Sequence, residues 1–220
     1  MGNPFTEFKN ALKKVLVNPT TRWITLAGFF RFFETFSIVY YLPVFFQKVY
    51  PLFKTEYGYY NAAIVAGCGF ISTILGGLIS DRFEKKNRMT KAYVCMVGSA
   101  LAIPAIAMCV LNTGNFHFSL FFMAIKYLLA ECWMSPAITM MQNTVKPEES
   151  GSIVSAHLFY LTVSGCFSTV LLGQLANWLG AAANPAIYGK LIFLFSIIGY
   201  IGSLPCFYKG GLEYKKYVES

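Results

Sequence analysis

Six long stretches with few or no charged residues recur along the 220-residue chain, and they constrain its fold more than any other feature. Each stretch holds at least about 18–20 residues, enough for a helix rising about 1.5 Å per residue to cross a hydrocarbon core of about 30 Å. Backbone polar groups in lipid must be satisfied within the segment, so the stretches are predicted to be helices and not strands. The predicted spans are residues 23–46, 57–80, 92–111, 116–143, 152–178 and 185–207.

Composition supports lipid as the solvent for most side chains. Hydrophobic residues make up 56% of the chain and charged residues only 13%, whereas a soluble domain carries about 25% charged residues. The six cysteines lie in apolar runs and form no CxxC pair, which argues against a zinc site or a disulfide framework. We therefore predict no metal and no cofactor, with the lipid bilayer as the first partner. Since GxSxG, P-loop and metal-ligand spacings are also missing from the sequence, an enzyme is not predicted.

The distribution of basic residues predicts the orientation of the helices. Six crossings return the chain to its starting side, where the connectors are residues 1–22, 81–91, 144–151 and 208–220. These connectors carry thirteen of the 18 Lys and Arg residues, whereas the opposite side has only Lys48, Lys54 and Lys190. The positive-inside rule then puts both termini in the cytoplasm, or in the matrix if the membrane is the mitochondrial inner membrane. Topology thus explains the net charge of +8, and no nucleic-acid partner is needed.

Residues 1–22 predict a short amphipathic segment that lies on the inner surface of the membrane. The transmembrane bundle is predicted to occupy residues 23–208, and an inner-side polar tail follows at residues 209–220. The apolar residues at helical spacing in the first segment are Phe5, Phe8, Leu12 and Val15.

Apart from Lys190, which lies near the outer end of its span, four charged residues lie inside the predicted spans, namely Arg31, Glu34, Lys126 and Glu131. Arg31 lies about 13 Å along its helix from Arg22, near mid-membrane, and it shares a helical face with Glu34. A charge at this depth is costly in lipid, so these side chains should face the bundle interior and pair, for example Arg31 with Glu131. Two interpretations stay open: a substrate or proton site, or a neutral ion-pair network that holds the helices together.

Small residues predict where helices approach closely. Ser72, Gly76 and Ser80 repeat at four-residue spacing, and Gly165 and Gly173 are predicted to act likewise. These residues indicate packing and identify no substrate.

The connector after the second predicted span reads GLISDRFEKK at residues 77–86. It resembles the G-x-x-x-D-R-x-G-R-K signature of the major facilitator superfamily, with Glu84 where the signature has glycine. An acid at a helix end among inner-side cations can make charge and helix-dipole contacts that hold one conformation closed. The residues aligned with the signature are Gly77, Asp81, Arg82, Lys85 and Lys86.

Three further stretches are similar to the carboxy-terminal half of a spinster-like transporter, and the resemblance covers about residues 8–208. It implies a half-bundle of six helices. In a complete transporter, two such half-bundles rock around a central site. The first and fourth helices of a half line the central cavity in this family, which implies the same position for the four intramembrane charges. The matching stretches are NPTTRW at 18–23, LLAECWMSPA at 128–137 and TVKPE at 144–148.

The resemblance leaves two functions open. The first is transport of a lipid-like or organic-anion substrate by a half-transporter that needs a complementary half, which is a second polypeptide or a second copy. The second is a transport-inactive, transporter-derived structural or accessory subunit of a large membrane complex, such as a respiratory-chain assembly. In both cases the predicted partner is another membrane polypeptide. The family also pairs the signature aspartate with a helix end of the opposite half, so Asp81 would find that partner outside these six helices.

Overall fold

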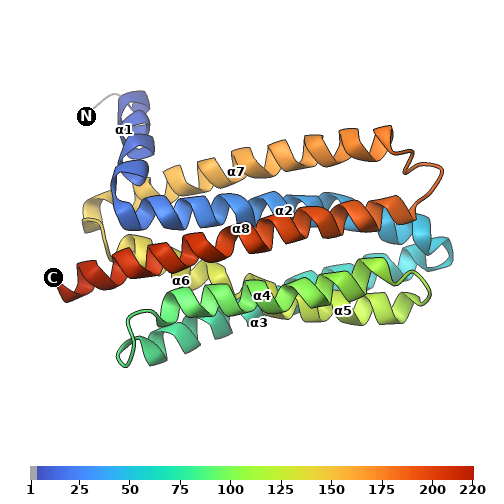
Figure 1. The fold of residues 1–220 in the computed structure, drawn as a ribbon, viewed down its shortest axis with the longest axis horizontal. Helices are drawn as coiled ribbons and strands as arrows, with labels where there is room; N and C mark the ends of the chain where they lie inside the picture. Colours follow the sequence, from blue (N-terminus) through green and yellow to red (C-terminus); the bar gives the residue numbers. More distant parts are fainter. Residues whose placement is uncertain (1–3) are drawn as a thin grey trace.

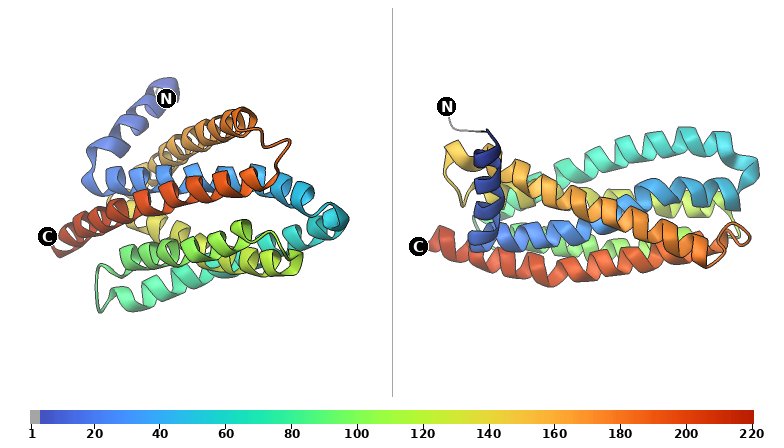
Figure 2. Two further views of the ribbon diagram at one scale, coloured as in Figure 1. Left: turned by 45° about the vertical axis from the view of Figure 1, so that its right-hand side comes forward. Right: turned by 90° about the horizontal axis from the view of Figure 1, so that it is seen from above.

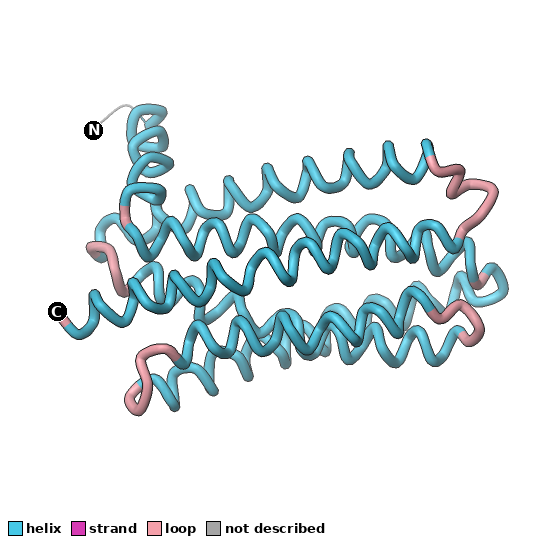
Figure 3. Tube along the Cα trace, in the orientation of Figure 1, coloured by secondary structure: helices cyan, strands magenta, loops and turns pink. Residues whose placement is uncertain are grey.

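The computed structural model describes residues 4–220, and side chains from Phe8 onward, as helices joined by short loops (Figure 3). The first three residues of the predicted segment 1–22, and the side chain of Phe5, lie outside the described residues. Within residues 4–220, six helical segments are long and apolar enough to cross a membrane. The predicted all-α fold with six membrane helices is therefore confirmed. The elements are α1 (Pro4–Val17), α2 (Pro19–Val49), η1 (Pro51–Phe53), α3 (Lys54–Glu84), α4 (Thr90–Leu111), α5 (Phe116–Ala130), η2 (Glu131–Trp133), α6 (Met134–Gln142), α7 (Pro147–Trp178) and α8 (Ala186–Glu219).

A sharp bend between α1 and α2 follows from the pair Asn18–Pro19. The Asn18 side chain accepts hydrogen bonds from the amides of Thr20 and Thr21, which would otherwise lack partners in the first turn of α2. Pro19 occupies the first helical position, where its missing N–H costs nothing. Helix α1 consequently lies across the end of the bundle, steeply inclined to the long helices (Figure 1).

The fourth span is interrupted, although the sequence pattern predicted one long helix over 116–143. Helix α5 ends at Ala130, a 3₁₀ turn forms η2, and α6 begins at Met134. Pro136 explains the interruption, because proline has no N–H for the carbonyl four residues earlier and its ring crowds that carbonyl. The break puts Glu131 in the 3₁₀ turn.

The last helix runs farther than the predicted span 185–207 and ends at Glu219. Gly210 and Gly211 allow this extension to pack closely, since an added Cβ would meet Ile24 of α2 at Gly210 and Ala92 of α4 at Gly211. The predicted polar tail 209–220 is thus helical almost to its end.

The long helices form two groups, α2 with α7 and α8, and α3 with α4 and α5. The two groups meet where α4 packs against α8. Helix α2 packs mainly against α8 and α7, while α4 packs against α8 and α5, and α3 against α5. The described termini lie at the same end of the bundle (Figures 1 and 2). Two apolar clusters fill the interior, one including Phe33 and Phe195 and the other including Ile24 and Trp133.

Candidate functional site

Arg31 and Glu34 form an ion pair that is completely enclosed by the bundle. The Arg31 Nη1 and Glu34 Oε1 atoms are 3.0 Å apart, and both side chains have 0% exposure. Their spacing of three residues brings them to one face of α2, as expected for neighbours on a helix. The two charges therefore neutralise each other inside the half-bundle.

Arg31 also joins three other elements. Its Nη2 donates a 2.7 Å hydrogen bond to the Ala130 carbonyl at the end of α5. Its guanidinium carbon lies 4.6 Å from the ring centre of Tyr200 on α8 and 5.5 Å from that of Trp133 in η2. Such cation–π contacts are strongest where water is excluded, so Arg31 links α2, α8 and the broken fourth span.

The second ion pair is Lys126 with Glu131. The Lys126 Nζ lies 3.3 Å from Glu131 Oε1 and 4.2 Å from the ring centre of Tyr127. The 3₁₀ turn positions Glu131 so that it reaches back to a lysine five residues earlier. The structure thus pairs each charge with a neighbour on its own span, and the example pairing of Arg31 with Glu131 is not formed.

The four charged side chains differ in access. Arg31 and Glu34 are fully buried and Lys126 is 1% exposed, but the Glu131 side chain is 22% exposed. The Glu131 backbone carbonyl lies 3.5 Å from the Thr73 hydroxyl of α3. Glu131 is therefore the group of this cluster that a molecule outside the half-bundle can reach.

Several buried polar atoms around Arg31 form no hydrogen bond with the described residues. They include Arg31 Nε, Glu34 Oε2, Trp133 Nε1 and the Tyr200 hydroxyl. Buried polar atoms in proteins nearly always have a partner. The cluster therefore keeps donors and acceptors that can bind a small polar group or pass a proton.

The signature segment forms a second polar network at the end of the bundle where the termini lie. Lys91, which is 1% exposed, lies 2.6 Å from Asp81 Oδ1 and 2.6 Å from Glu84 Oε2. The Tyr214 hydroxyl of α8 donates to Glu84 Oε1 and accepts a 3.0 Å hydrogen bond from Asn143 Nδ2. Glu84, the residue that departs from the signature, thus connects α3 with α4 and α8.

The remaining signature residues are arranged differently. Gly77 faces Ser135, whose hydroxyl an added Cβ would meet. Arg82, Lys85 and Lys86 are exposed, and none of them forms an ion pair with the described residues. These three cations are consequently available to groups outside the half-bundle.

The small residues predicted to allow packing lie at helix contacts. Ser72, Gly76 and Ser80 are three of the four buried residues of α3, and an added Cβ at Gly76 would meet the backbone of Cys132. A Cβ at Gly165 would meet the Phe36 ring, and one at Gly173 would meet the Tyr41 hydroxyl.

Sequence reasoning did not single out Tyr200, Trp133, Lys91 or Tyr214 as members of these clusters. Only Lys91 had a signal in the sequence. Asp81 and Glu84 are three residues apart on one helical face, and a lysine at the start of the next helix is placed to pair with them. The two aromatic residues that contact Arg31 reach it only through tertiary packing.

Comparison with known proteins gives the same fold and a family. The family model described as Major Facilitator Superfamily matches residues 2–169. An "MFS-type efflux pump" of Mycolicibacterium smegmatis is 19% identical over 211 residues, which are 94% of this chain and 47% of that protein. The "Multidrug transporter protein MdtP" of Bacillus subtilis is 24% identical over 189 residues, which are 86% of this chain and 32% of that protein.

One solved structure has a similar fold along the whole chain. It is the crystal structure of a bacterial homologue of the human lysosomal transporter Spinster, in an inward-facing and unoccupied conformation. The TM-score is 0.71 at 16% sequence identity, and the match covers 100% of this chain and 53% of that chain. The chain therefore spans about half, or less, of the length of these proteins.

Proposed function

The chain belongs to the Major Facilitator Superfamily, as its sequence predicted, and we propose that it is one six-helix half of a transporter that works with a complementary half. Family and fold point to a transporter of the membrane and not to an enzyme. Alternating access needs two halves that rock around a shared site. The chain matches 47% and 32% of the two named relatives and 53% of the solved structure, which supports a need for a second half.

The observation that carries this proposal is the uncovered face of α3. Only four of its 31 residues are buried, namely Tyr57, Ser72, Gly76 and Ser80. Gly67 lies nine residues before Gly76, which is two and a half helical turns and hence the opposite side of the helix. An added Cβ at Gly67 would meet nothing within 4 Å. An open glycine in an apolar helix permits close approach of another helix, and we propose the complementary half as that neighbour.

Glu131 is the proposed coupling group within the half. It is the most exposed of the four intramembrane charges, and its negative charge neutralises Lys126 at 3.3 Å. Protonation of Glu131 would leave Lys126 without its counter-ion in a low-dielectric site, where an unpaired charge is costly. An anionic headgroup could then replace the carboxylate. This coupling suits the lipid-like or organic-anion substrate that the family resemblance implied.

The named relatives support transport of organic molecules in general. One is described as an efflux pump and the other as a multidrug transporter. Their names indicate the class of activity that we propose for the assembled protein, and the substrate class rests on the resemblance and on the charges of the site.

Purification in mild detergent tests the proposal. We expect one homologous polypeptide, or a further segment of the same chain, to complete twelve helices, and the assembly to drive uptake after reconstitution into vesicles. Recovery of a multi-subunit complex that lacks any second six-helix half would contradict the proposal.

A second function is favoured by the enclosure of Arg31 and Glu34. Two side chains with 0% exposure, one of them bonded to a backbone carbonyl, have the geometry of an ion pair that stabilises the fold. We therefore keep a transport-inactive accessory subunit of a large membrane complex as the alternative. It predicts normal assembly and no uptake for the parent protein in reconstituted vesicles.

We also propose that both termini face the cytoplasm, or the matrix of a mitochondrion. The described ends of the chain lie at one end of the bundle (Figure 1), where the basic connector 81–91 also lies. An impermeant thiol reagent should label a Ser220→Cys variant only after sealed cells or organelles are opened. Labelling of intact cells or organelles would indicate the opposite orientation of the termini.

A further inference from the structure

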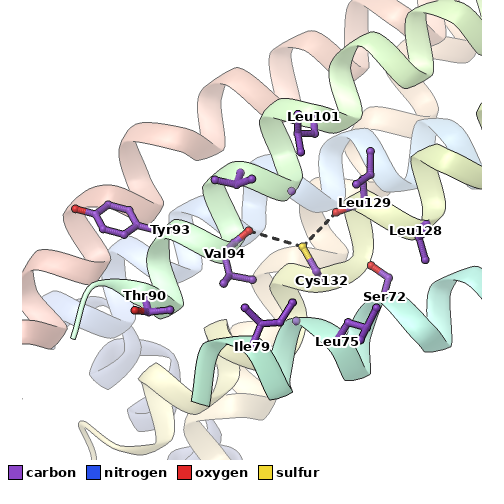
Figure 4. Close-up of a pocket in the computed structure, with 13 residues that line it drawn as sticks. Ser72, Leu75, Ile79, Thr90, Tyr93, Val94, Leu101, Leu128, Leu129 and Cys132 are labelled. Carbon is purple, nitrogen blue, oxygen red and sulfur yellow. Dashed lines mark hydrogen bonds between the residues drawn. The ribbon is translucent and has the colours of Figure 1, made fainter. Parts of the chain in front are cut away.

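An apolar groove runs along the outside of the half-bundle between α3, α4 and the broken fourth span (Figure 4). Its volume is about 470 Å³, within the range of about 300–1,000 Å³ that is typical of ligand sites. The walls are open outward, since Val97 is 56% exposed and Leu101 49% exposed. The groove is lined on its two sides by residues such as Leu75 and Ile79 of α3 and Val94 of α4.

One buried polar side chain in this groove has no partner. Ser72 is 1% exposed, and its hydroxyl forms no hydrogen bond with the residues that the structure describes. The neighbouring Cys132 thiol is already engaged, because it lies 3.2 Å from the Leu129 carbonyl and 3.7 Å from the Val94 carbonyl (Figure 4). Buried hydroxyls usually have a partner. The deep end of the groove therefore holds a polar group that the described residues leave without a partner.

The inner end of the groove opens beside the basic signature connector. Ile79 and Thr90, which line this end, flank the connector in the sequence. Lys91 is neutralised by Asp81 and Glu84 at 2.6 Å each. Arg82, Lys85 and Lys86 are exposed and form no ion pair with the described residues, and Arg88 adds a further charge. The rim of an apolar groove thus carries an excess of positive charge.

We propose that this groove binds one anionic phospholipid of the inner leaflet. From Thr90 to Leu101 the groove follows eleven residues of α4, roughly 16 Å, which is close to the hydrocarbon depth of one leaflet. The acyl chain lies between α3 and α4, and the phosphate meets the exposed cations of the connector. Basic residues at the inner membrane surface attract anionic lipids in this way. Ser72 lies ten residues before Arg82, about 15 Å along α3, so it lies at the deep end of the groove beside the acyl chain.

The lipid site is distinct from the proposed contact with a complementary half. Ser72 and Gly76 face the groove, whereas Gly67 lies on the opposite side of α3. A resident lipid would hold α3 and α4 together along a face that the protein itself leaves open. Its binding is measured without any transport assay, so failure of one proposal does not decide the other.

The test compares phosphatidylglycerol with phosphatidylcholine of identical acyl chains, each titrated into the detergent-purified protein, with bound lipid counted by native mass spectrometry. We expect one phosphatidylglycerol to bind about tenfold more tightly, the factor that one or two surface cations supply. Val97→Phe should fill the groove and lower binding several-fold, whereas Val163→Phe, at a residue of α7 that is similarly exposed, should not. K85Q/K86Q should remove the preference for the anionic lipid, and K9Q/K13Q in α1 should retain it.

Three results would overturn the proposal. The first is equal binding of the two lipids, and the second is unchanged binding in the Val97→Phe variant. The third is a polypeptide, and not lipid, that crosslinks to a Val97→Cys variant in the membrane.

Discussion

The guanidinium of Arg31 donates a 2.7 Å hydrogen bond to the carbonyl oxygen of Ala130, a residue 99 positions later in the chain. Ala130 ends α5, and carbonyls at a helix end lack intrahelical donors. A side chain from the first span therefore satisfies the backbone that is exposed where the fourth span breaks. This contact fixes α2 to the break in the hydrophobic interior of the half-bundle.

Removal of Arg31 should destabilise the fold and not only the activity. Arg31→Ala leaves Glu34 unpaired at 0% exposure and the Ala130 carbonyl without its donor, a loss of about 3–5 kcal/mol for a broken buried pair. Arg31→Lys keeps the charge but lacks the planar fork that serves two acceptors at once, so it should be intermediate. Thermal unfolding in detergent, monitored by size-exclusion chromatography, gives the order of stability of the parent and the two variants.

The double variant R31M/E34M separates the two interpretations of this pair. Replacing both members of a buried ion pair by apolar residues is often neutral or stabilising. If the pair only stabilises the fold, the double variant should fold like the parent and keep its uptake. A folded double variant without uptake assigns the pair to transport, and an Arg31→Ala variant that unfolds like the parent rules out the structural role.

Glu131→Gln should abolish proton-coupled uptake while the chain stays folded. Glutamine keeps the shape of Glu131 but cannot exchange a proton, and the partial exposure of the site, 22% for Glu131, reduces the cost of leaving Lys126 unpaired. Uptake in reconstituted vesicles under a pH gradient is the measurement. Glu56→Gln, at an exposed glutamate in the first turn of α3, is the control and should transport normally. Unchanged coupling in the Glu131→Gln variant would remove this residue from the mechanism.

Much of the architecture was predictable because lipid imposes simple rules on sequence. A span must be apolar over about 20 residues and helical, so the number of crossings could be read from runs such as 92–111, which the structure gives as Thr90–Leu111. The start of α2 at Pro19 was also encoded locally, by an asparagine cap followed by proline. These features depend only on residues that are close together in the chain.

The details of the charged cluster were less predictable because they depend on tertiary packing. The spacing of Arg31 and Glu34 indicated a shared face, but the contact of Arg31 with Tyr200 joins α2 to α8 and has no local signal. The break at η2 redirected Glu131 toward Lys126 on its own span. The alignment of the signature likewise marked Glu84 as a departure, without indicating that Lys91 and Tyr214 would bind it.

Two glycines of α3 should respond to the same substitution in opposite ways. Gly76→Leu would drive a side chain into the backbone of Cys132 and should destabilise the isolated half by at least about 1–3 kcal/mol, as overpacking does. An added Cβ at Gly67 would meet nothing within 4 Å, so Gly67→Leu should not lower the thermal stability of the half. Under the proposed function Gly67→Leu should nevertheless reduce co-purification of the complementary half. If the Gly67→Leu variant recovers the complementary half in full, the interface does not lie on this face of α3.

Loss of Lys91 should loosen the end of the bundle that carries the signature. Lys91→Met removes the donor shared by Asp81 and Glu84, and a partly buried acceptor left without its donor costs about 1–3 kcal/mol. Asp81 is 63% exposed and can be solvated, so most of the effect should come through Glu84, at 16% exposure, and its link to Tyr214. The melting temperature in detergent should therefore fall by several degrees.

The control is Lys86→Met, at an exposed residue without an ion pair to the described chain. It should leave the melting temperature within about a degree of the parent value, since such surface substitutions have small effects. Adding Glu84→Gln to Lys91→Met removes the stranded carboxylate and should recover part of the loss. If the double variant melts lower than Lys91→Met alone, the network is not organised around the Lys91–Glu84 pair.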